Sequence, residues 1–362
     1  MTSTAAQAPS LGLHRRSRRV TAVLAGSLLA VALVLLVVWP TPYMIWATGG
    51  QANVLVGPNG GAAITVRGIT PQPVNGTLLV SSVTEQAPRA GLPQLLAGYI
   101  AGGHDVFPLE VSQLGVSEPS GTSDDSQLAP WQRNAVVAAL RAAGYQPAQA
   151  AIVSSVVVGG PAYTLLDVND IVTAVDGTPV SSAAAVADAI AKRSPSQTIQ
   201  FDILRGDVAY DDIEVTSQAA NDDPTATVVG ASFANTFTFA PADVRFNLAP
   251  AANDPTSGLM IALGLYDMLQ PNDVLRGWTV SGIGEVDPSG AVSTQPVVGV
   301  HERATAAVDA GAKIFFVPDT ACSIAAAFSG QMTVVQVANL SDVIADLGLL
   351  ATDPKSPQVH YC

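Results

Sequence analysis

The chain has 362 residues, 48% of them hydrophobic, and a formal net charge of −13 at pH 7. Such an acidic surface repels phosphate backbones, which excludes nucleic acid as a main partner. Two cysteines and four scattered histidines offer neither a disulfide-dense scaffold nor metal-ligand spacing, so no metal is expected.

The first part of the chain predicts a membrane anchor. Four arginines in residues 1–19 precede an apolar run over residues 20–39. About 20 apolar residues suffice to cross a hydrocarbon core of ~30 Å, and no clear signal-peptide cleavage site follows. Because basic residues flank only the N-terminal side, we expect residues 1–19 to be cytoplasmic and the later domains to be extracytoplasmic. The lipid bilayer is thus one expected partner, through residues 20–39 of a single-pass protein in the cell membrane.

Residues 43–147 predict a β-rich and helical segment. Short β-rich runs at 52–56 and 77–83 are punctuated by glycine and proline. Residues 101–127 are polar and predict a loop, and a helix is predicted over 131–143, with Gly144 as its stop signal. We expect this segment to pack with the C-terminal domain.

Residues 148–218 carry the motifs of a peptide-binding module. The turn Gly159–Ala162, the run Val168–Val180 with its Asp-Gly turn, and a predicted helix over 182–192 together resemble a PDZ domain. PDZ domains bind an extended peptide as an added strand at a sheet edge, so the resemblance implies polypeptide ligands. The alternative is a module that only braces its neighbour. Residues 221–224 predict the linker to the next domain.

The most informative stretch begins with Asp254-Pro255-Thr256-Ser257-Gly258 and continues as an amphipathic helix pattern. A hydroxyl at a helix N-terminus lies near unpaired backbone N–H groups and the positive end of the helix dipole. That position favours a developing oxyanion, so the stretch suits a hydroxyl nucleophile.

This stretch resembles the Pro-Ser-Ala-Gly-Leu nucleophile motif of the Lon-type proteases, with Thr256 at the position of the family's serine. The segment Val298–Arg303 is similar to the family's Gly-Gly-Ile-x-x-Lys helix start, with Arg303 at the lysine position. A hairpin-like segment, Ser281–Val292, and a helix-Gly-strand-Pro segment, Asp309–Pro318, follow the family's order. The resemblance covers about residues 225–350.

The whole chain resembles the membrane-anchored, PDZ-containing Lon-like serine proteases of Gram-positive bacteria. This implies an α+β chain: a transmembrane helix, a PDZ-like domain, a Lon proteolytic-domain-like α/β fold and a tail over 351–362. No phosphate-loop motif occurs, so the resemblance implies an ATP-independent endopeptidase ancestry without a cofactor. Lon-like domains tend to form rings, which implies a homo-oligomer by analogy.

The residues at the two chemical positions argue against strong peptidase activity. A lysine base works only when its neutral amine can accept the hydroxyl proton, and arginine, with a pKa of about 12.5–13.8, stays charged. The extra methyl of Thr256 restricts its side chain and crowds the attacking oxygen. We therefore expect a peptidase homologue with lost or weakened activity that binds polypeptides through the PDZ-like domain and the former substrate groove.

Several alternatives remain open from the sequence. Thr256 or Ser257 could cap the following helix, and Arg303 could pair with Asp254 or Glu302. Another alternative is an active endopeptidase that uses Thr256 or Ser257 as its nucleophile.

Two groups could serve as the base of such an enzyme. His301 could act with Thr256, and Lys313 is the one lysine within the Lon-like stretch. A structural envelope protein is the third class of function.

The two cysteines, Cys322 and Cys362, lie in the part of the chain expected outside the membrane. Because that compartment is oxidising, they predict a disulfide that ties down the tail.

Overall fold

The computed structural model describes residues 20, 22–31, 34, 41–87, 90–101, 106–108, 128–206, 208–239 and 242–362. The predicted cytoplasmic segment, part of the predicted anchor and most of the predicted loop over 101–127 lie outside these residues. Within the described part, no helix is both long and apolar enough to cross a membrane.

Two compact units divide the chain: residues 1–47 with 84–115, and residues 48–83 with 116–362. The first unit contains the helix α2 and the short strand β4, which pairs antiparallel with the start of β1 in the register Tyr43↔Pro108. The bounds are β1 (Tyr43–Asn53), α2 (Leu92–Ala101) and β4 (Val106–Pro108).

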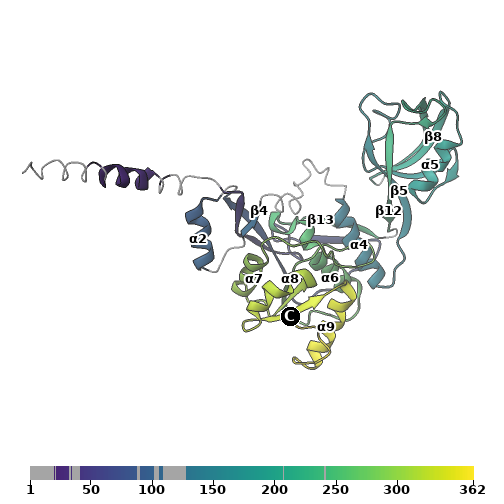
Figure 1. Cartoon of the computed structure of the whole chain (residues 1–362). Helices are drawn as coiled ribbons and strands as arrows, with labels where there is room; N and C mark the ends of the chain where they lie inside the picture. The colour runs from purple at the N-terminus through teal and green to yellow at the C-terminus, as the bar shows by residue number, and fades with distance from the viewer. Residues whose placement is uncertain are drawn as a thin grey trace, which may run out of the picture. The chain divides into compact units, whose positions relative to one another are not determined.

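The second unit holds an α/β domain and, at the stretch that resembles a PDZ domain, a β-rich domain that is called the PDZ domain below (Figure 1). The α/β domain is built on strands in the order β16-β15-β14-β3-β1, in which β3, β14, β15 and β16 run parallel. Its strands are β2 (Ile64–Arg67), β3 (Thr77–Ala87), β13 (Asp243–Phe246), β14 (Thr279–Gly282), β15 (Ile314–Pro318) and β16 (Thr333–Val337). Its helices are α4 (Pro130–Ala142), α6 (Gly258–Leu269), α7 (Val300–Asp309), α8 (Asp319–Ala325) and α9 (Leu340–Thr352).

Both faces of this sheet are covered, as parallel sheets require. Strand β15 is buried along its whole length, and its side chains alternate between two cores. Ile314 and Phe316 pack with α4, α6 and α9, whereas Phe315 and Val317 pack with α7 and α8. The α/β architecture therefore follows from one continuous apolar strand between two layers of helices.

The PDZ domain has a separate core and a sheet of order β12-β5-β6-β8-β9, with β7 paired to β6. Inside it, the buried Asp170 forms an ion pair with Arg205 at 2.7 Å. The bounds are β5 (Ala148–Val156), β6 (Ile171–Val175), β7 (Thr178–Pro179), α5 (Ala183–Ala191), β8 (Thr198–Arg205), β9 (Val208–Thr216), β10 (Gln218–Ala219), β11 (Thr227–Val228) and β12 (Ala231–Thr238).

One boundary differs from the prediction. Strand β12 falls within the stretch assigned to the Lon-like domain from residue 225, yet it pairs antiparallel with β5 over its full length. The PDZ sheet thus closes with a strand that follows the predicted linker. The partner strand β5 is about 80 residues earlier, and such long-range pairing leaves no local sequence signal.

Candidate functional site

The turn before α6 is organised by Asp254. This residue is the N-cap of a short 3-10 helix, Pro255–Ser257, that leads into α6. Its Oδ1 accepts hydrogen bonds from the Thr256 backbone N–H and from the Thr256 hydroxyl, both at 2.7 Å. The capping side chain is therefore Asp254, because an aspartate before a proline turn reaches the next free amide. Ser257 holds the N-cap position of α6, as one interpretation of the sequence expected, but its hydroxyl makes no capping hydrogen bond.

The backbone amides at this helix start are already paired. Besides the Thr256 amide, the Ser257 amide donates to the Asp254 carbonyl at 2.9 Å. The Gly258 amide donates to the Pro255 carbonyl, and the Leu259 amide donates to the Gly284 carbonyl at 2.9 Å. An oxyanion hole needs free donors, and these four amides provide none.

The structure brings Arg303 to the same turn. Its guanidinium, on α7, donates through Nη2 to Asp254 Oδ2 at 3.1 Å. It also donates through Nε to the Val298 carbonyl at 3.3 Å and through Nη1 to the Ser81 carbonyl. The Arg303 side chain is only 4% exposed, so these partners compensate a charge that has been removed from water.

Two glycines allow this close packing. Gly299, with φ of 70°, precedes α7, and an added Cβ would collide with Val83. Gly284, with φ of 157°, donates to the Thr256 carbonyl at 2.7 Å, and a Cβ there would lie 2.9 Å from Val292 Cγ1. A larger residue at either position would displace the segments that hold Thr256 and Arg303.

The other candidate residues occupy different surroundings. Ser257 is 1% exposed, and its hydroxyl has no hydrogen-bond partner among the described residues. The His301 ring packs against the Phe328 ring, with centroids 5.0 Å apart. Glu302 is buried on α7, and Lys313 is exposed at the start of β15.

A groove of about 380 Å³ is lined by α4 and by the hairpin-like segment before α7. Its lining includes Glu285, Asp287 and Asn134. Glu285 reaches solvent on one side, yet partial desolvation and the nearby charge of Asp254 raise its pKa. Asp287 is also partly desolvated, which by itself would raise its pKa. Hydrogen bonds from Ser289 and the following amides outweigh this effect and lower the pKa of Asp287. The groove is consequently acidic.

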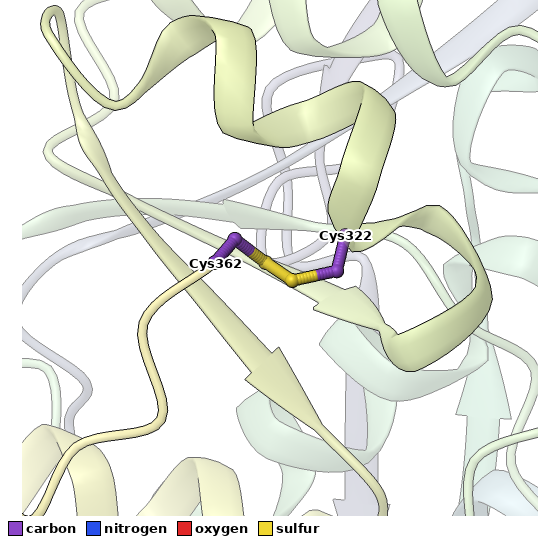
Figure 2. The surroundings of a disulfide bond; sticks show 2 residues. All are labelled: Cys322 and Cys362. Carbon is purple, nitrogen blue, oxygen red and sulfur yellow. A yellow bond between two sulfur atoms is a disulfide. The ribbon is translucent and has the colours of Figure 1, made fainter.

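Cys322 and Cys362 are joined by a disulfide, with their Cα atoms 5.3 Å apart (Figure 2). Cys322 lies on α8, and the last residues of the chain run beside β16. The Cys362 amide donates to the Val334 carbonyl at 3.1 Å, and the Gln336 amide donates to the His360 carbonyl at 2.8 Å. The tail therefore pairs with the sheet, in addition to its covalent link.

The PDZ domain offers an open sheet edge. Strand β12 is the last strand of the sheet on its side within the described chain, and α5 lies next to it. The Asn235 side chain of β12 accepts a hydrogen bond from the Ala183 amide, at the start of α5, at 2.9 Å. The Ser182 hydroxyl caps the same helix.

Backbone groups along β12 face this edge. Val153 makes two backbone hydrogen bonds of 2.8 Å with the segment leading into β6, so its neighbour Ile152 faces β12 and pairs with Ala234. Because the direction alternates along a strand, the N–H and C=O groups of Phe233 and Asn235 point away from β5. An extended peptide could pair with these groups.

Comparison with known proteins agrees with this part of the structure. The PDZ domain family matches residues 123–216, so the chain contains a PDZ domain, which implies binding of peptide ligands. No curated protein matches the chain.

Solved PDZ domains are among the similar structures. The PDZ domain of the SdrC-like protein from Listeria monocytogenes is 21% identical, covers 23% of this chain and 85% of its own length, and gives a TM-score of 0.21. The corresponding domain from Listeria innocua is 20% identical, with coverages of 23% and 90% and a TM-score of 0.21. A protein of Geobacillus thermodenitrificans is 19% identical, with coverages of 22% and 90% and a TM-score of 0.20.

Proposed function

We propose that this protein is a membrane-anchored, extracytoplasmic polypeptide-binding protein of the Lon-like type that has lost peptidase activity. The PDZ domain takes the peptide ligand at the β12 edge beside α5. In this proposal, the turn before α6 and the start of α7 correspond to the family's nucleophile turn and lysine helix, with Thr256 and Arg303 in place of the two chemical groups.

The observation that carries this proposal is the chain of contacts from Thr256 through Asp254 to Arg303. The threonine hydroxyl donates to Asp254 at 2.7 Å, and the opposite carboxylate oxygen accepts from Arg303 at 3.1 Å. A carboxylate held by a guanidinium and by two donors of Thr256 serves as a structural acceptor. A guanidinium keeps its protons at neutral pH and does not act as a base.

Two further features support the loss of hydrolysis. The amides at the start of α6 have acceptors within the protein, which leaves no preorganised donors for an oxyanion at that turn. The alternative nucleophile, Ser257, is buried at 1% exposure and cannot meet a substrate without rearrangement of the turn.

The test is hydrolysis of fluorescein-labelled casein by the full chain in detergent. Wild type should release no more fluorescence than buffer, whereas the double variant Thr256→Ser/Arg303→Lys should exceed it by about tenfold or more, because nucleophile and base act as a unit. The matched control, Thr256→Ala/Arg303→Lys, contains the lysine but no hydroxyl. Wild-type hydrolysis that disappears in Thr256→Ala or in Ser257→Ala would overturn the proposal.

The membrane topology is tested separately. Intact cells treated with an external protease should lose an epitope placed beside Lys355, since basic residues flank only the N-terminal side of the apolar run. Protection of that epitope would contradict the extracytoplasmic location.

A further inference from the structure

Helix α2 presents a row of exposed apolar side chains. Leu92, Leu96 and Ile100 follow one another at intervals of four residues, so they lie on one face of the helix. They are 43%, 58% and 75% exposed. The helix sequence LPQLLAGYIA contains no charged residue. A soluble surface helix normally carries charge on its exposed side, so this face is suited to an apolar environment.

The position of α2 in the chain indicates which environment that is. Ala90, which is buried just before α2, accepts a hydrogen bond from the Thr41 amide at 3.1 Å and donates to the Tyr43 carbonyl at 2.9 Å. The Gly91 amide donates to the Gln94 side chain at 2.8 Å and fixes the start of the helix. The beginning of α2 is therefore attached to residues 41–43.

Residues 41–43 directly follow the apolar run over 20–39. Two residues of extended chain span about 7 Å at most. The polar zone on each side of a bilayer is about 5–8 Å thick. If the apolar run crosses the membrane, Thr41 and the start of α2 lie at the level of the lipid headgroups. A helix of ten residues is about 15 Å long, short enough to lie within that zone.

We propose that α2 binds the outer leaflet of the membrane, with Leu92, Leu96 and Ile100 inserted among the acyl chains. The side chain of Tyr43, 40% exposed next to the attachment point, belongs to a residue type that collects at membrane interfaces. This inference rests on the membrane topology proposed above.

The chemistry also specifies the kind of lipid contact. Because α2 is uncharged, its binding depends on apolar contact alone. We therefore expect it to be insensitive to salt and to lipid charge.

The experiment uses the full chain in nanodiscs of phosphatidylcholine, with an NBD fluorophore on Leu96→Cys. The two native cysteines are joined in a disulfide and stay unlabelled without reductant. A matched control, Val208→Cys, has nearly the same exposure, 55% against 58%, on the PDZ domain. Leu28→Cys reports on the apolar run itself. Ile100→Cys repeats the measurement if labelling at Leu96 disturbs the helix.

Lipids with a shallow doxyl group should quench the Leu96 probe at least about twofold more than the Val208 probe. This ratio should be unchanged between about 0.05 and 0.5 M NaCl, a range over which screening removes charge effects, and on addition of phosphatidylglycerol. Equal quenching at Leu96 and Val208, with strong quenching at Leu28, would overturn the inference and leave the anchor intact. Weak quenching at Leu28 as well would overturn both the binding of α2 to the membrane and the membrane span over residues 20–39. A blue-shifted Leu96 probe without doxyl quenching would show that protein covers α2, which also overturns the inference.

Discussion

The guanidinium of Arg303 and the carboxylate of Asp254 are 3.1 Å apart, although 49 residues separate them in the sequence. This pair connects α7 to the turn that precedes α6. The same guanidinium also binds the carbonyls of Val298 and Ser81, so one side chain joins four segments of the α/β domain. These contacts predict a structural role for Arg303, and that role can be measured.

Arg303→Ala should lower the free energy of unfolding of the α/β domain by about 3–5 kcal/mol, because it leaves Asp254 and two carbonyl groups without their partner. Tryptophan fluorescence in urea excludes the PDZ domain, since residues 148–238 contain no tryptophan, and Trp131 and Trp278 report on the α/β domain. The matched control is Lys313→Ala, an exposed position at which a change within about 0.5 kcal/mol is expected. A loss below about 1 kcal/mol for Arg303→Ala would contradict the structural role.

Asp267→Asn should reduce the pH dependence of stability. Burial raises the pKa of Asp267 above its ordinary value of 3.8, although hydrogen bonds from backbone amides oppose the shift. The folded state then holds this proton more tightly than the unfolded state. The contribution of protonated Asp267 to the free energy of unfolding is fully present below pH 3.8. It is lost as the pH rises through the pKa of Asp267 in the folded state.

We therefore compare the free energies of unfolding of Asp267→Asn and wild type at each pH. The difference should favour the variant more at about pH 7 than at about pH 4. The measurement is urea unfolding across this range. Asp309→Asn, at an exposed position on α7, serves as the control and should follow the wild-type curve. Parallel curves for wild type and Asp267→Asn would show that the carboxyl has no such role.

Removal of the disulfide by Cys322→Ser/Cys362→Ser should cost about 3–4 kcal/mol, the chain-entropy value for a loop of 40 residues. Hydrogen exchange gives a local measurement. The Gln336 amide, bonded to the His360 carbonyl at 2.8 Å, should exchange faster once the tail is released. Two reactive thiols in the native, unreduced protein would refute the linkage itself.

Asn235→Ala should weaken peptide binding by the PDZ domain several-fold, because the Asn235 side chain holds the start of α5 against β12. The probe is the tightest binder from a library of C-terminal heptapeptides, with affinity measured by fluorescence anisotropy. Asn235→Asp keeps the acceptor for the Ala183 amide and is the matched control. Equal affinity of wild type and both variants would place the peptide elsewhere.

Local features of the structure could be predicted from the sequence. Gly144 and the apolar pattern before it predict a helix over 131–143, and the structure has α4 over Pro130–Ala142. The combination of turns that resembles a PDZ domain was confirmed by the family match. The expected pairing of Arg303 with Asp254 also occurs. In each case, residues close in sequence or of opposite charge determine the outcome.

Other features depend on contacts that local patterns do not contain. Strand β12 joins the PDZ sheet because β5 supplies its partner, and no property of residues 231–238 alone selects that sheet. An aspartate directly before Pro255 is a sequence signal for Asp254 as the cap of the following turn. The hydroxyl residues that follow it are equally good capping residues, so the sequence alone does not select Asp254. Ser257 is buried, and its neighbours Thr256 and Leu259 form hydrogen bonds with Gly284, a long-range contact that local patterns do not contain.

The parallel pairing of β3 with β14 has a consequence for folding. Thr77 lies opposite Thr279, and the Ser281 hydroxyl donates to the Leu79 carbonyl across 202 residues of sequence. The PDZ domain falls entirely within this interval. Its sheet needs no partner outside residues 148–238, so it can form as soon as those residues emerge from the ribosome. The central sheet must wait for β14, and during that wait β3 has an unpaired edge that is open to pairing with a wrong strand.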